Sequence, residues 1–135
     1  MTDSPVTIFH NPDCGTSRNA LRAILDQGYA PTVVLYLEKA WTAPQLADLI
    51  GRMGVPARAV LREKGTPAET LGLLDPAVSD EVLIAAMVEH PILVNRPIVE
   101  TPLGVVMARP SERVFDVLDR RPATFVKEDG EVVVL

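Results

Sequence analysis

The chain has 135 residues, of which 47% are hydrophobic and only 4% are aromatic. A chain of this length can bury one core, built here mainly from aliphatic side chains, so we expect a single domain over residues 1–135. The net charge of -5 argues against nucleic acid or a membrane surface as a partner, because both require a dense cationic face.

The sequence carries no signal for export or membrane insertion. Its first residues lack a basic segment followed by an apolar run, and a run of about 18 apolar residues, as a membrane span requires, occurs nowhere. Cys14 is the single cysteine, so an internal disulfide is impossible and nothing indicates an oxidising compartment. We therefore expect a cytoplasmic protein.

The first part of the chain predicts a βαβ unit. Residues 6–10 (VTIFH) form a β-rich run between two prolines, and residues 16–28 carry apolar side chains at helical spacing. Residues 32–37 (TVVLYL) are typical of a buried strand. A strand, a helix and a second strand in this order place the two strands parallel in one sheet.

The middle of the chain predicts helices. The segment TAPQ at 42–45 has the spacing of a capping box and begins a helix that ends near Met53. The segment TPAE at 66–69 repeats the same device, and Ser79 begins a third helix that runs to about Glu89.

The last third returns to β structure. Residues 97–100 and 104–108 flank a Thr-Pro-Leu-Gly turn and predict a hairpin, and Pro110 begins a last helix through Leu118. The tail after about residue 119 fits either a small hairpin with an Asp-Gly turn or a loosely packed end. The whole order, βαβ, helices and then ββα, predicts an α/β thioredoxin-like fold with a mixed sheet and a helical insertion.

Cys14 lies where the first strand passes into the first helix. It follows Asn-Pro-Asp and precedes Gly-Thr-Ser, a run too polar and turn-prone for a core. Free backbone N–H groups and the helix dipole at this point favour a thiolate, the reactive form of cysteine, and the same donors could hold an oxyanion beside the sulfur. An ordinary small buried residue is the alternative, and position alone does not decide between the two.

Other polar residues surround the thiol in the sequence. Arg18 places a cation in the first turn of a helix, where it opposes the dipole, so it is either a surface side chain or present for function. His10, with Asn11 beside it, could stabilise the thiolate or orient a proton donor if it faces the same loop. One cysteine and two histidines are too few for a structural zinc site, and Ser17 occupies the position that a C-x-x-C redox pair needs.

Four separated motifs, HNPDCGTSRN, RAVLREKG, HPILVNRPIV and TPLGVVMARPSE, closely resemble those of the glutaredoxin-dependent arsenate reductases of the bacterial arsC type. The resemblance covers about residues 6–118. It implies a thioredoxin-like fold and reduction of arsenate to arsenite with glutathione as co-substrate and glutaredoxin as partner, without a bound cofactor or metal. It also implies that Cys14 is the nucleophile and that His10 lowers its pKa.

The resemblance extends to further site residues. Its three anion-binding arginines fall on Arg62, Arg96 and Arg109. Ser17 falls on a hydrogen-bond partner of the sulfur, and Pro97 on the cis proline of thioredoxin-like folds. Arginine suits an oxyanion because its planar fork offers paired donors and stays charged. Asp13 departs from the small neutral residue of many members, and its carboxylate must point away from the thiol or be neutralised.

Two other functions stay open at this point. Related proteins of this fold are transcriptional regulators that bind RNA polymerase through a Cys-x-x-Cys switch near the same place, and Ser17 counts against that function. An arginine-lined thiolate could also serve a glutathione-dependent enzyme with another substrate.

Overall fold

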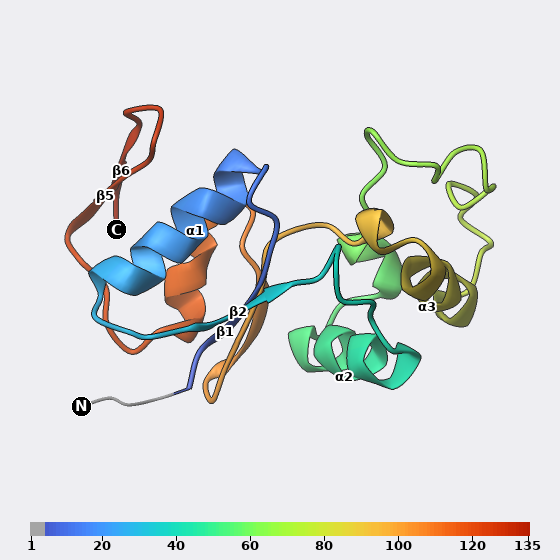
Figure 1. Cartoon of the computed structure of the whole chain (residues 1–135), viewed down its shortest axis with the longest axis horizontal. Coiled ribbons are helices and arrows are strands. Elements are labelled where there is room, and N and C mark those ends of the chain that lie inside the picture. The colour runs from blue at the N-terminus through green and yellow to red at the C-terminus, as the bar shows by residue number, and fades with distance from the viewer. Residues whose placement is uncertain (1–4) are drawn as a thin grey trace. The chain divides into compact units, whose positions relative to one another are not determined.

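The computed structural model describes residues 5–135, which form two compact units. The first unit joins the residues up to Leu35 with those from Arg96 to Leu135, and the second unit comprises Tyr36–Asn95. The second unit contains the helices of the middle of the chain and no strand of the four-stranded sheet (Figure 1). The chain therefore folds as an α/β unit with a helical insertion, as predicted.

The first unit is built on a four-stranded mixed sheet. Its strands are β1 (Thr7–His10), β2 (Thr32–Leu35), β3 (Ile98–Thr101) and β4 (Gly104–Met107), in the order β2-β1-β3-β4. β1 pairs parallel with β2 and antiparallel with β3, and β3 pairs antiparallel with β4. These pairings confirm the predicted βαβ unit and the predicted hairpin. The helix α1 (Gly15–Asp26) lies between β1 and β2 in the chain.

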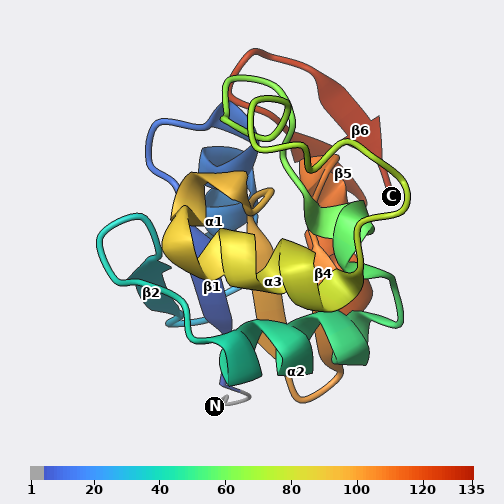
Figure 2. The ribbon, with the colours of Figure 1, turned by 90° about the vertical axis from the view of Figure 1, so that its right-hand side faces the viewer.

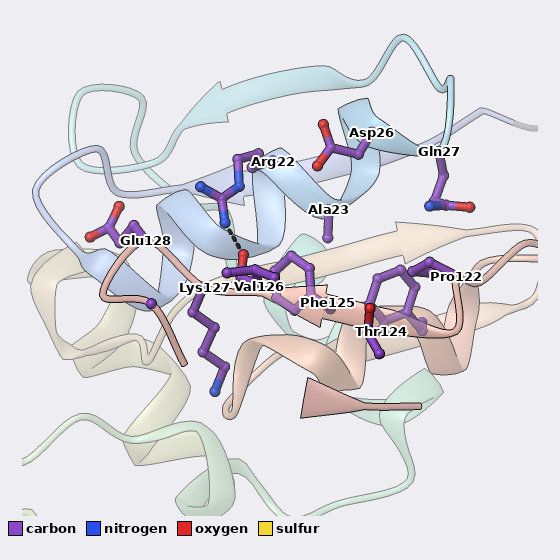
Figure 3. A pocket seen from close by; sticks show the side chains of 12 residues that line it. Arg22, Ala23, Asp26, Gln27, Pro122, Thr124, Phe125, Val126, Lys127 and Glu128 are labelled. Carbon is purple, nitrogen blue, oxygen red and sulfur yellow. Dashed lines mark hydrogen bonds between the residues drawn. The ribbon is translucent and has the colours of Figure 1, made fainter. Parts of the chain in front are cut away.

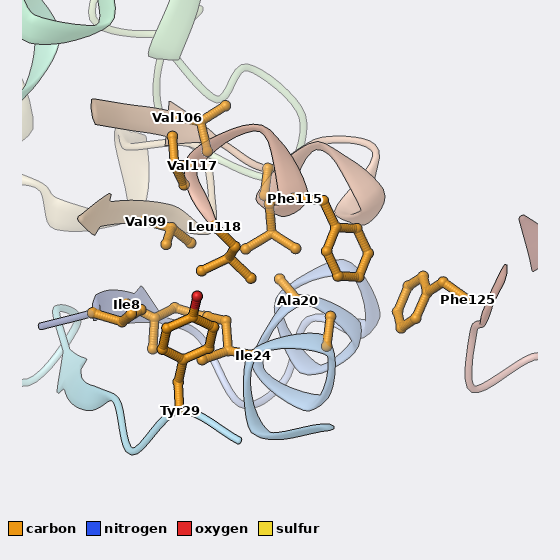
Figure 4. Packing of buried hydrophobic residues seen from close by; sticks show 14 residues of the cluster. Ile8, Ala20, Ile24, Tyr29, Val99, Val106, Phe115, Val117, Leu118 and Phe125 are labelled. Carbon is orange, nitrogen blue, oxygen red and sulfur yellow. The ribbon is translucent and has the colours of Figure 1, made fainter. Parts of the chain in front are cut away.

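The core of the first unit lies between this sheet and two helices. Ile8 and Val99 of the sheet pack with Ile24 of α1 and with Phe115 of η3 (Ser111–Val117), and all four are buried (Figure 4). The last helix was predicted to follow Pro110, and it does so as a 3₁₀ helix. It is short, and its backbone bonds close after three residues, as in helices of that type.

The tail forms a hairpin, which decides between the two alternatives that the sequence left open. β5 (Thr124–Val126) pairs antiparallel with β6 (Val132–Val134). Gly130 has a φ of 94°, a left-handed conformation that glycine adopts without steric cost, and its N–H donates to Lys127 O at 2.9 Å. Phe125 is buried and contacts the Phe115 ring edge-on, with the centroids 5.7 Å apart. The tail is therefore part of the core of the first unit.

The second unit is helical, and two of its predicted helix starts are confirmed. α2 (Ala43–Met53) begins after Thr42, whose side chain accepts from Gln45 N, and α3 (Asp80–Glu89) begins after Ser79, whose side chain accepts from Val82 N. α2 and α3 pack against each other (Figure 2). Two short 3₁₀ segments, η1 (Ala57–Val60) and η2 (Pro91–Leu93), complete the unit. Within residues 5–135 every helix is too short or too polar to cross a bilayer.

The prediction of a helix that begins at Thr66 is wrong, because the structure has no helix there. Thr66 Oγ1 does accept from Ala68 N at 3.2 Å, and Leu71 N donates to Pro67 O at 2.9 Å, which makes one turn. Gly72 then has a φ of 75°. A residue in the left-handed region ends a helix, so the capping pattern produces a single turn rather than a helix.

Candidate active site

Cys14 is the N-cap residue of α1, in the loop that leaves β1. Its backbone is extended, with φ -105° and ψ 122°. Its N–H donates to Asn11 O at 3.1 Å, and the side chain of Asn11 accepts from Asp13 N at 3.0 Å. Asn11 therefore stabilises the loop through its backbone carbonyl and its side chain. Cys14 is only 7% exposed.

The surroundings of Cys14 lower its pKa. Burial acts in the opposite direction and raises the pKa, as it does for any buried thiol. Backbone hydrogen bonds from Ser17 and Thr16 to the sulfur act against burial. The charge of Arg96 and a hydrogen bond from Arg109, whose Nη1 lies 3.6 Å from Sγ, lower the pKa further. The net effect favours the thiolate, as predicted from the position at a helix start.

Arg96 and Arg109 lie at one edge of the sheet. Arg96 precedes β3 and Arg109 follows β4, and these antiparallel neighbours bring the two residues together. Nη1 of Arg109 donates to Arg96 O at 3.0 Å. Each of the two arginines is joined to the proline that follows it by a cis peptide bond, Arg96–Pro97 and Arg109–Pro110. The resemblance predicted the first of these bonds, and no pattern in the sequence indicated the second.

His10 is buried at the end of β1, and the partner of its ring is Ser17. Nδ1 of His10 lies 2.6 Å from Ser17 Oγ, which also accepts from Asn11 N at 3.1 Å. Burial lowers the pKa of His10, and the charge of Arg18 lowers it further, so the imidazole is neutral near pH 7. A neutral ring does not stabilise a thiolate by charge. The geometry favours an indirect role for His10, which orients Ser17 in the first turn of α1.

Ser17 also divides its contacts between two groups. Its backbone N–H lowers the pKa of the Cys14 thiol, whereas its hydroxyl lies against His10 and Asn11. The resemblance predicted Ser17 as a partner of the sulfur without saying through which atom. In this structure it is the backbone N–H of Ser17 that acts on the pKa of the thiol, a donor that every residue except proline can supply.

Arg18 is paired with Glu128 of the tail. Nε and Nη2 of Arg18 donate to the two carboxylate oxygens at 3.1 and 2.7 Å, and Nη1 donates to Pro12 O at 2.8 Å. Sequence reasoning singled out Arg18 but missed Glu128, since the two residues are 110 positions apart and no local signal connects them. Asp13 is exposed, and its charge acts on Arg18.

Arg62 belongs to the second unit. Its Nε donates to Lys64 O at 3.2 Å, and its side chain is partly buried. Its part in binding an anion stays a prediction from the resemblance.

A hollow of about 600 Å³ lies elsewhere in the first unit, between α1 and the tail (Figure 3). Its lining includes Arg22, Asp26, Phe125 and Lys127 but not Cys14. Across residues 5–135, His, Cys, Asp and Glu side chains do not gather in threes in a way that could hold a metal ion.

The chain resembles known proteins along almost its whole length. Residues 9–117 match the model of the ArsC family. An arsenate reductase of Escherichia coli is 53% identical over 132 residues, which cover 97% of this chain and 94% of that protein. The arsenate reductase ArsI1 of Synechocystis is 50% identical over 135 residues, which cover 99% of this chain and 94% of that protein.

A solved structure shows the same fold. The arsenate reductase from Vibrio cholerae aligns with a TM-score of 0.83 at 39% identity, over 87% of this chain and 100% of that one. This agreement confirms the predicted thioredoxin-like α/β fold. With the family model matched from Phe9 to Val117, this chain belongs to the ArsC family.

Proposed function

We propose that this protein reduces arsenate to arsenite with Cys14 as the nucleophile. The observation that carries the proposal is the environment of the Cys14 thiol. The residue is buried at the start of α1, where backbone N–H groups lower the pKa of the thiol, and Nη1 of Arg109 lies 3.6 Å from Sγ. Relatives at 50% and 53% identity are named arsenate reductases. Their names support arsenate as the substrate here.

The substrate is a compact oxyanion, and a chain with a net charge of -5 can hold it only through local cations. Arg96 and Arg109 provide two such cations at the sheet edge beside the sulfur. The free N–H groups of the α1 start supply further donors. Arg62 is the third arginine of the proposed anion site, on the strength of the resemblance alone.

The proposed reaction begins with attack of the Cys14 thiolate on arsenic(V). A sulfur–arsenic bond forms, and one arsenate oxygen leaves as water after protonation. Glutathione displaces a second oxygen in the same way. A glutaredoxin thiolate then attacks the glutathione sulfur, so that a disulfide forms and the electron pair of the glutathione–arsenic bond stays on arsenic, which becomes arsenic(III). Water replaces Cys14 on arsenic and releases arsenite and the free thiol.

The composition supports the use of external thiols. Cys14 is the single cysteine of the chain, so no second thiol of the protein can resolve the adduct. Glutathione as co-substrate and glutaredoxin as partner would supply the two electrons. The reaction as proposed uses no bound metal or organic cofactor, and it would take place in the cytoplasm, where both thiols are kept reduced.

Coupled oxidation of NADPH tests the proposal. Purified protein is assayed with glutathione, glutathione reductase and glutaredoxin, with and without arsenate. We expect oxidation that requires arsenate and stops when either thiol is omitted. Oxidation that ignores arsenate would point to the glutathione-dependent enzyme with another substrate. Absence of turnover, together with binding to RNA polymerase, would point to the regulator, against which Ser17 already counts.

A further inference from the structure

The C-terminal hairpin, residues 124–134, is attached to α1 by polar contacts. Glu128 accepts two hydrogen bonds from Arg18, and its N–H donates to the buried side chain of Asn19 at 2.8 Å. One turn further along α1, the side chain of Arg22 donates to Val126 O (Figure 3). Three side chains on one stretch of α1 therefore hold the hairpin.

These contacts continue from the hairpin into the thiol loop. Nη1 of Arg18, the nitrogen that does not reach Glu128, donates to Pro12 O at 2.8 Å. Pro12 lies two residues before Cys14. A Cβ at Gly15 would lie 3.0 Å from Glu128 Oε1, so the glycine leaves room for the carboxylate beside the start of α1. Glu128, Arg18 and Pro12 thus form one connected path to the thiol.

The hairpin can hold Glu128 in place because it is itself anchored. Phe125 is 5% exposed and packs edge-on against Phe115 in the core. Lys127 Nζ lies 2.9 Å from Glu112 Oε1 of η3, and this pair is largely shielded from solvent. An ion pair between exposed side chains is usually weak because holding both partners costs entropy, but a carboxylate on an anchored turn has already lost much of that freedom.

We propose that Glu128 is a positioning residue for Cys14: it holds Arg18 on the Pro12 carbonyl and so keeps the thiol loop aligned with the start of α1. The backbone N–H groups of Thr16 and Ser17, which lower the pKa of Cys14, then stay near the sulfur. Glu128 lies beyond residues 9–117, the part of the chain that the family model covers. The proposal concerns the reactivity of the thiol and goes beyond the choice of arsenate as substrate.

Electrostatics alone predicts the opposite sign, which makes the proposal testable. The charged and titratable groups around the sulfur are Arg96 and Arg109 at the sheet edge, Arg18 on α1, Asp13 in the loop and His10 on β1. Glu128 neutralises one of these cations, Arg18. If Glu128 did no more than that, its removal would expose a cation near the thiol and lower the pKa of Cys14. If Glu128 positions the loop, its removal raises the pKa of Cys14 instead, because the donors of the loop lose their alignment with the sulfur.

The test is the pH dependence of Cys14 alkylation by iodoacetamide, followed by mass. The variants are Glu128→Ala, Arg18→Ala and the double variant. Glu131→Gln is the matched control, since it removes one negative charge from the same hairpin and leaves Lys127 its contact with Glu112. We expect both single variants to raise the midpoint and, at a pH at least one unit below the wild-type midpoint, to slow alkylation by about three- to tenfold, as a rise of about half to one pKa unit implies. The double variant should have a midpoint similar to those of the single variants, because all three remove the same chain of contacts from Glu128 through Arg18 to Pro12.

An unchanged or lowered midpoint in Glu128→Ala would overturn the proposal, whatever happens to stability. So would a midpoint raised equally in Glu131→Gln. Thermal unfolding shows whether each variant is folded, and Glu128→Gln, which keeps the size of the side chain, replaces Glu128→Ala if the latter unfolds. Alkylation needs no arsenate, so failure of the proposed function leaves this result standing, and failure here leaves arsenate turnover to be judged separately.

Discussion

Replacing Arg109 with alanine tests how the anion site is built. Nη1 of Arg109 is shared between Cys14 Sγ at 3.6 Å and Arg96 O at 3.0 Å. The change removes a positive charge from beside the sulfur and a donor that would face the oxygens of a bound oxyanion. We expect weaker stabilisation of the thiolate and of the charge that develops as arsenate reacts.

The geometry bounds the size of the effect. Two unit charges separated by the 3.6 Å of this contact attract each other by roughly 5 kcal/mol at an effective dielectric constant of about 20. Desolvation and the remaining charge of Arg96 reduce that figure, and loss of one donor to a developing oxyanion typically costs about 2 to 4 kcal/mol. The expected loss in kcat/KM for arsenate is therefore roughly 30-fold to 1,000-fold.

The coupled NADPH assay measures this loss, with Arg113→Ala as the control. Arg113 lies nearby on η3, but its guanidinium is exposed and its partner is Asp116 at 3.9 Å, so its removal should leave kcat/KM unchanged. Arg109→Lys should fall between the two, because lysine keeps the charge and loses the planar fork. Wild-type kcat/KM in Arg109→Ala would refute the reasoning.

Three further predictions concern His10 and the tail. His10→Asn, whose side-chain amide can still hydrogen-bond Ser17 Oγ, should leave the pH midpoint of Cys14 alkylation close to that of the wild type, because the ring that it replaces is neutral; a clear rise would identify His10 as a charged neighbour. The pKa of His10 in the folded state lies below its ordinary value of 6.5, so the unfolded chain binds the extra proton as pH falls below that value. The unfolding free energy from urea titrations should then decrease on acidification more steeply in the wild type than in His10→Gln, and parallel curves would contradict this. Phe125→Ala should lower the unfolding free energy by about 3 kcal/mol, and a loss below about 1 kcal/mol would mean that the tail adds little to the core.

Local pattern was sufficient for the parts of the site that depend on one segment or on strand order. Cys14 stands out because a cysteine between a short strand and a helix start is surrounded by turn residues. Arg96 and Arg109 could be expected together once the hairpin of residues 97–108 was recognised, since the hairpin returns the chain to the edge where it began. The resemblance joined these separate signals into one site.

The remaining features depend on contacts that a local pattern does not carry. Glu128 reads as one acidic residue among several in an exposed turn, and only the folded chain shows it against Arg18. The neutral state of His10 follows from burial, which the sequence around it did not indicate. The expected helix at Thr66 had a correct cap, but one glycine with positive φ stopped it after a turn.

Arsenate-dependent NADPH oxidation by Cys14→Ser tests the central claim most directly. Serine nearly preserves the size of the side chain and all backbone donors around it, so the fold and the arginines should stay in place. Its hydroxyl does not ionise near neutral pH and cannot form the sulfur–arsenic bond through which the electrons pass. We predict that Cys14→Ser, assayed with glutathione and glutaredoxin, shows no arsenate-dependent oxidation above the rate without enzyme. Oxidation at a rate comparable to that of the wild type would contradict the assignment of Cys14 as the nucleophile.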